Sequence, residues 1–200
     1  MSDSILEVAR RADLFFMETS PIHDAMRRLT KTLRGMEIPF AIAGAMAANA
    51  HGHKQTTDDV NVLIGLQDLQ RFKAQHIGHG WIDKHEGSKS FHDTVNDVNI
   101  GVLIAGEFPG DGRPKPVAFP MPEAVTVFLG EGIPYVSLPT LLELKTACAM
   151  TTSHRPRDLD DVIQLIRANK LTLEYADQLN PYVQDKYREL WQAAQVDEEY

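Results

Sequence analysis

Two short segments of this sequence repeat the same alternation of an acid, an apolar residue and an amide. The first, DVNV, begins at Asp59, and the second, DVNI, begins at Asp97. Because alternate side chains of a β-strand share a face, each acid lies beside the amide two residues later, Asn61 or Asn99. Carboxylate and amide oxygens are ligands of hard cations such as Mg²⁺. If the two strands are neighbours, the segments predict a metal site where their polar ends meet.

A second interpretation of the same segments is purely structural. Asp and Asn side chains bond nearby backbone groups where a strand begins, and such turns need no cation. The spacing of the residues alone leaves both interpretations open.

Other polar side chains also have two interpretations. His51 and His53 could form a metal pair, or they could mark a helix end at Gly52. Lys145 could neutralise a phosphate, or it could lie along an apolar helix with its ammonium in solvent. The segment beginning at Arg157 has the features of a capped helix start with surface ion pairs.

Hydrophobic periodicity predicts the elements that must position these residues. Pro21 begins a helix that ends near Gly35. A short apolar strand ends at Gly44, and small residues after it form a tightly packed helix. The segment 106–122 is rich in glycine and proline, which predicts a long ordered loop. Strands are predicted at 39–43, 59–64, 81–86, 91–94, 97–104, 124–128 and 134–137, and further helices at 45–50, 66–76, 138 onward, 157–168 and 181–195.

Composition and charge restrict the classes of protein that fit. The chain has 200 residues, 43% hydrophobic and 24% charged, which predicts a single domain with a core at about 36–166 and a helical extension at about 170–196. A net charge of −8 argues against extended nucleic-acid binding. Without a long apolar run or a signal-like N-terminus, we expect a cytoplasmic protein with no membrane partner. Cys148 lies in an apolar run and is predicted to be a small buried side chain.

The order of the motifs resembles a known superfamily. The segment IAGA ending at Ala45, the helix after it, the strand from Asp59 and the later acid Asp97 resemble the polymerase-beta-like nucleotidyltransferases. Further on, LPTLLELK ending at Lys145 and RDLDDV from Arg157 are similar to segments of bacterial abortive-infection nucleotidyltransferase toxins. The resemblance spans about 40–166. It implies an α/β (α+β) fold with a mixed, nucleotidyltransferase-like sheet flanked by N- and C-terminal helices.

The resemblance also implies a metal and a catalytic centre. Asp59 and Asp97 would be the catalytic carboxylates, and together with Asn61 they would hold Mg²⁺ or Mn²⁺. The metal would bridge a nucleoside triphosphate and activate the hydroxyl of an acceptor that the sequence does not identify.

Four further residues would bind the substrate according to the same resemblance. Gly44 and Ala45 would let the backbone approach the triphosphate at a helix start. Lys145 would neutralise phosphate charge, and Asp158 would orient either Lys145 or the acceptor.

Two departures from the superfamily pattern bear on activity. Asn61 stands where the family has its second strand acid, and Ala45 stands where it has Ser or Gly. An amide adds no charge to a metal site, so the cation is expected to bind weakly. Three functions remain open: a nucleotidyltransferase, a catalytically silent relative that binds a nucleotide, a protein or a second copy of itself, and a metal-free interaction module.

Overall fold

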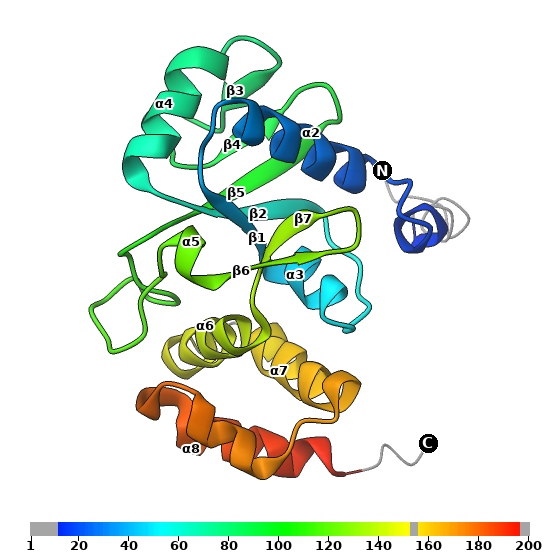
Figure 1. Ribbon diagram of the computed structural model, residues 1–200, viewed down its shortest axis with the longest axis vertical. Coiled ribbons are helices and arrows are strands. Elements are labelled where there is room, and N and C mark those ends of the chain that lie inside the picture. Colours follow the sequence, from blue (N-terminus) through cyan, green and yellow to red (C-terminus); the bar gives the residue numbers. More distant parts are fainter. Residues whose placement is uncertain (1–11, 153–155, 197–200) are drawn as a thin grey trace.

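The computed structural model describes residues 12–152 and 156–196 (Figure 1). The segment 1–11, on which part of the localisation argument rests, lies outside the described residues. After a helical turn at 12–16, the chain combines helices with a mixed sheet, which confirms the predicted α/β (α+β) class. Within the described part of the chain, no helix is long and apolar enough to cross a bilayer.

The sheet of the described residues has seven strands in the order β3-β4-β5-β2-β1-β7-β6. β2 runs parallel to β5 and β1 runs parallel to β7, whereas the other neighbouring strands are antiparallel. The strands are β1 (Phe40–Ala43), β2 (Asp59–Ile64), β3 (Trp81–Asp83), β4 (Phe91–Asp93), β5 (Val98–Ile104), β6 (Thr126–Leu129) and β7 (Ile133–Val136).

The helices surround this sheet unevenly. In Figure 1, α2 and α4 lie at one end of the molecule, and α6, α7 and α8 form a layer at the other. The predicted C-terminal extension corresponds to η1 and α8, and α8 packs against α6 and α7. The helices are α2 (Pro21–Gly35), α3 (Gly44–Ala50), α4 (Leu66–His76), α5 (Pro122–Val125), α6 (Leu138–Thr151), α7 (Pro156–Asn169), the 3₁₀ helix η1 (Leu173–Gln178) and α8 (Pro181–Ala194).

The two faces of the sheet differ in polarity because strand side chains alternate. On one face, Val60 and Ile100 are buried on neighbouring strands, and α2 packs against these strands. On the other face, Asp59 and Asn61 are only partly buried. The polar residues of β2 therefore lie on the face of the sheet opposite to α2.

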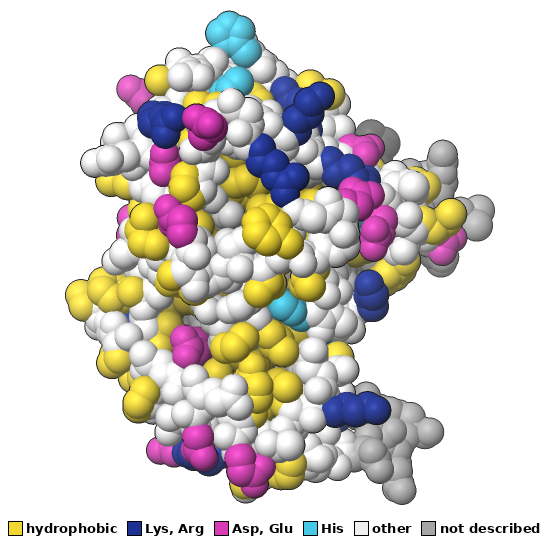
Figure 2. Space-filling model, viewed as in Figure 1, with side chains coloured by type: hydrophobic (Ala, Val, Ile, Leu, Met, Phe, Trp, Pro, Cys, Tyr) yellow, Lys and Arg dark blue, Asp and Glu magenta, His cyan; other side chains and the backbone are white. Residues whose placement is uncertain are grey.

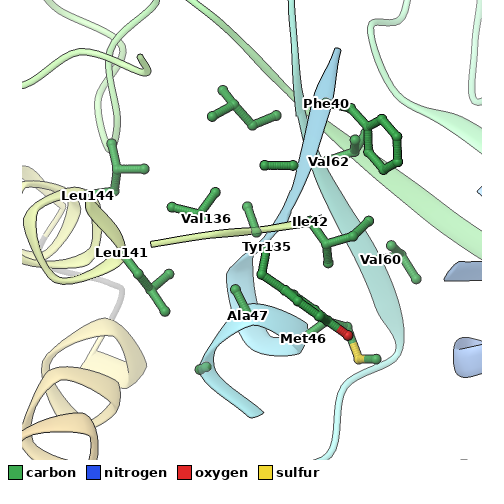
Figure 3. Packing of buried hydrophobic residues seen from close by; sticks show 14 of the residues in the cluster. Phe40, Ile42, Met46, Ala47, Val60, Val62, Tyr135, Val136, Leu141 and Leu144 are labelled. Carbon is green, nitrogen blue, oxygen red and sulfur yellow. The ribbon is translucent and has the colours of Figure 1, made fainter. Parts of the chain in front are cut away.

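The core joins the middle of the sheet to α3 and α6. Figure 3 shows Ile42 of β1 and Val62 of β2 close to Tyr135 and Val136 of β7, with α6 beside them. All four side chains are buried, as expected for central strands that are covered on both sides. Further labelled members of this cluster are Phe40, Met46, Ala47, Val60, Leu141 and Leu144.

Several predicted strand bounds are corrected by the structure. The strands predicted at 81–86 and 91–94 end at Asp83 and Asp93. The strand predicted at 97–104 begins one residue later, because Asp97 has a φ of 57°, a left-handed rather than extended conformation. The strand predicted at 124–128 begins at Thr126, since Pro122 starts a short helical turn before it.

Charged side chains are interspersed on the face of the molecule seen in Figure 2. Basic side chains in its upper half lie among acidic ones instead of forming a stripe, and apolar side chains gather over α6 and α7.

An ion pair with a buried carboxylate fixes α2 to β4, next to one edge of the sheet. Asp93 is fully buried and accepts hydrogen bonds from the Arg28 guanidinium, from the backbone N–H of Val95 at 2.9 Å and from Nδ2 of Asn96 at 2.8 Å. The Arg28 guanidinium also lies 4.0 Å from the centre of the Trp81 ring. Removing one charge of such a pair leaves the other without compensation.

We therefore predict that Asp93→Asn lowers the free energy of unfolding by about 3 kcal/mol, measured by urea denaturation. Asp97→Asn is the matched control, because the Asp97 side chain is 96% exposed and asparagine tolerates its left-handed backbone. The control should change stability by less than about 0.5 kcal/mol. Equal losses in the two variants would contradict the role assigned to the buried pair.

Candidate functional site

A cavity of about 300 Å³ opens between the polar face of the sheet and helices α6 and α7. Asp59 and Asn61 form its floor on β2, and Leu141, Leu144 and Lys145 of α6 form the opposite wall. The predicted long loop also lines the cavity, through Pro109, Gly110 and Phe119.

The carboxylate of Asp59 accepts hydrogen bonds from side chains two residues before and two residues after it. Oδ1 accepts a hydrogen bond from Oγ1 of Thr57 at 2.9 Å, and Oδ2 accepts one from Nδ2 of Asn61 at 3.2 Å. Two carboxylates at these positions would repel each other and would need a cation between them. The amide of Asn61 instead meets the Asp59 carboxylate as a hydrogen-bond donor, so this pair has no such repulsion.

The Asn61 side chain fills a space that two glycines leave. A Cβ atom on Gly44 would lie 2.9 Å from Nδ2 of Asn61, and a Cβ atom on Gly101 would overlap its Oδ1. Gly44 also has a φ of 62°, a conformation that favours glycine. The amide is therefore held between the start of α3 and the neighbouring strand β5.

Asp97 does not join Asp59 in the cavity, so its predicted placement is wrong. Its side chain is 96% exposed, lies 3.0 Å from Nε2 of His92 and does not line the cavity. In the parallel pairing of β2 with β5, Asp59 lies opposite Asn99. The two DVN segments are thus offset by two residues, and Asn99 is the neighbour of Asp59 that the sequence argument did not choose.

Lys145 lines the cavity, as expected, and its side chain is buried. Its ammonium donates to Oδ2 of Asp161 and, at 3.3 Å, to Oδ1 of Asp158. Asp158 therefore contacts Lys145, which is one of the two roles expected for it. Asp161 is a residue that the sequence argument missed, and the signal for it was its position three residues after Asp158 on the same helical face.

Gly44 and Ala45 both line the cavity, at the turn from β1 into α3. α3 has only seven residues, so its N-terminal dipole is small. The loop that follows α3 is fixed to α7, because Arg157 donates to Oε1 of Gln55 at 2.9 Å and to the Thr56 carbonyl at 2.8 Å. This contact holds the segment that leads into Asp59.

The two histidines do not form a metal pair with each other. Nε2 of His51 lies 2.8 Å from the carbonyl oxygen of Val136, whereas Nε2 of His53 lies 3.2 Å from Oδ1 of Asp161. They belong to the end of α3, in agreement with the structural interpretation. Cys148 is buried, which confirms its predicted environment.

The position of α6 depends on the C-terminal extension. Oε1 of Glu143, on the side of α6, accepts the backbone N–H of Asn180 at 2.6 Å. Burial raises the pKa of the Glu143 carboxyl, and the hydrogen bond from Asn180 opposes that rise. The extension thus anchors the helix that carries Lys145.

Comparisons with protein-family models and with curated proteins find no match for this chain. The assignment of a function therefore depends on the cavity and its residues.

The close approach of Asn61 to β5 gives a testable prediction. Gly101→Ala should lower the free energy of unfolding by about 1–3 kcal/mol, because the added methyl overlaps the Asn61 amide. In the double variant with Asn61→Ala, much of that loss should disappear, and a double-mutant cycle in urea measures the coupling. Gly35→Ala is the control, since nothing lies within 4 Å of a Cβ atom there. Additive losses in the cycle would contradict the contact.

Proposed function

We propose that this protein is a catalytically silent, nucleotidyltransferase-like binding module that holds a nucleoside or a nucleotide in the cavity without transferring it. One observation carries the proposal: the amide of Asn61 donates to the carboxylate of Asp59. The hydrogen bond between these two side chains forms without a cation. Two-metal transfer uses a group of carboxylates that need metal ions to bring them together.

The geometry around Asn61 supports this interpretation. Its Nδ2 is engaged by Asp59, and its Oδ1 packs against the backbone of Gly101. A metal coordinated between Asp59 and Asn61 would have to displace the amide from a position fixed by β5. Asp97, the other expected carboxylate, lies outside the cavity.

The lining of the cavity indicates what kind of ligand it takes. Binding sites for small molecules combine apolar walls with a few convergent polar groups, and about 300 Å³ is at the small end of their range. Leu103, Phe119, Leu141 and Leu144 offer apolar surface for a flat ring. Asp59 accepts two hydrogen bonds from the protein and retains lone pairs for hydroxyl or amino groups of a ligand.

The charge of the lining favours a ligand with few phosphates. Three aspartates, Asp59, Asp158 and Asp161, line the cavity with two basic residues, Lys145 and Arg157. The ammonium of Lys145 already contacts two of the carboxylates. A triphosphate without a cation would meet a net negative lining, so we infer that a nucleoside or its monophosphate binds better.

Nucleotidyl transfer is the second candidate, because Asp59 and Lys145 lie on opposite walls of one cavity. In that case Mg²⁺ or Mn²⁺ and a nucleoside triphosphate would bind there together with an acceptor. The two candidates differ in a single measurable property, which is incorporation of label from a nucleoside triphosphate.

We predict that at least one of the four ribonucleosides or their 5′-monophosphates binds with a dissociation constant below about 1 mM by calorimetry, without added Mg²⁺. Asp59→Asn should weaken binding about tenfold, because a charged acceptor becomes neutral. Asp58→Asn is the matched control, since Asp58 is exposed and does not line the cavity. If no probe binds, the binding proposal fails. Metal-dependent incorporation by the wild type that is lost in Asp59→Asn would establish the enzyme instead.

Asn61→Asp gives a second prediction, on stability. Replacing the donor by a carboxylate places two acids side by side, which should lower the free energy of unfolding by about 1–3 kcal/mol. Mn²⁺ should restore the loss, as measured by thermal unfolding with and without the ion, whereas the wild type should show no Mn²⁺ response that depends on Asp59.

The control for this prediction exchanges the two side chains. The double variant Asp59→Asn with Asn61→Asp keeps one donor and one carboxylate, so it should regain stability and lose the Mn²⁺ response. A wild-type Mn²⁺ response that disappears in Asp59→Asn would show that the amide does not exclude the cation.

A further inference from the structure

A second group of polar side chains lies on the other side of Asp161 from the cavity. His53, Asp160 and Asp161 each place one ligand atom within 4.8 Å of the others. His53 follows α3, and the two aspartates are consecutive on α7. The group opens onto a surface depression whose lining includes Lys54 and Gln164.

The spacing of the donors suits direct coordination of a metal ion. Nε2 of His53 lies 3.2 Å from Oδ1 of Asp161. Two ligands with metal bonds of about 2.1 Å and angles of about 90–109° lie about 3.0–3.4 Å apart. A cation can therefore take both atoms as neighbouring ligands without a change in their separation. Asp160 completes a set of one nitrogen and two oxygens.

Neighbouring groups hold the candidate ligands in place. The Lys145 ammonium bonds Oδ2 of Asp161 and leaves Oδ1 directed toward His53. Nε2 of Gln164 donates to Oδ1 of Asp160 at 3.2 Å, which leaves the other oxygen of that carboxylate for a cation. The backbone N–H of His53 bonds the Ala48 carbonyl at 2.9 Å. Such second contacts orient the ligands of metal sites.

The charges of the ligands suit a cation. Asp160 and Asp161 each bring a carboxylate to the group, and the ammonium of Lys145 contacts Oδ2 of Asp161 rather than the Oδ1 that lies beside His53. Two basic side chains, Lys54 and Arg167, also line the depression, and the Arg167 guanidinium donates to the carbonyls of Ala194 and Val196 at 2.9 and 2.8 Å.

We propose that His53, Asp160 and Asp161 bind a transition-series dication, with Zn²⁺ as the best fit. An imidazole nitrogen among the ligands favours Zn²⁺ over Mg²⁺ or Ca²⁺, which prefer sites made of oxygens alone. Three protein ligands leave positions open toward the depression for water or an incoming group. This site is distinct from the one that the sequence predicted at Asp59, and it does not depend on nucleotide binding.

The test is titration of the full-length, untagged protein with ZnCl₂, followed by calorimetry and by the visible spectrum after Co²⁺ substitution. We expect one ion per chain, with His53→Gln and Asp160→Asn each weakening binding about tenfold or more. His85→Gln and Asp185→Asn are matched controls, because both side chains are exposed and lie outside the group. They should leave the affinity unchanged. Asp161→Asn is avoided because it would disrupt the buried pair with Lys145.

Three results would overturn the site. The first is no Zn²⁺ binding below about 1 mM, and the second is equal affinity in wild type and His53→Gln. The third is loss of binding in Asp59→Asn with none in His53→Gln, which would move the metal to the cavity. Because His53→Gln and Asp160→Asn leave Asp59 and Asn61 unchanged, nucleoside binding can succeed or fail independently of this outcome.

Discussion

The parallel pairing of β2 with β5 decides which polar groups meet in this protein. Asp59 lies opposite Asn99, and Asn61 lies opposite Gly101. Only a residue without a side chain at that second position leaves room for the Asn61 amide, which then reaches the Asp59 carboxylate. A pairing shifted by two residues would place Asp97 beside Asp59 and would crowd two amides together. The register thus keeps Asp97 away from Asp59 and leaves the Asn61 amide as its hydrogen-bonded neighbour.

Periodicity in the sequence was sufficient for most elements, since burial on one or both faces determines the order of apolar residues, whereas the mixed sheet was expected from the resemblance. It could not give the register. A shift of one residue exchanges the faces of a strand, but a shift of two preserves them, so both pairings of the DVN segments fit the pattern equally well. Gly101 was the available signal, because a glycine inside a strand often marks a close approach of another group.

The sequence also could not predict which distant side chains contact each other. His51 and His53 have a spacing that suggests one shared site, yet the chain turns at Gly52, where φ is 97°. One ring consequently meets β7 and the other meets α7. The resemblance to the superfamily placed Lys145 at the cavity, whereas its partner Asp161 required the packing of α6 on α7. Sequence patterns specify faces of elements, and tertiary packing specifies partners.

Asp161 joins the two sites that we propose, because one of its oxygens contacts Lys145 and the other contacts His53. A dication beside His53 would draw negative charge of Asp161 toward itself and weaken its hold on the ammonium. Lys145 would then be more available to an anionic group in the cavity. Linkage requires the reverse as well: a phosphate bound by Lys145 would leave Asp161 freer to coordinate the metal. The two ligands would therefore favour each other, while an uncharged nucleoside would be indifferent to the ion.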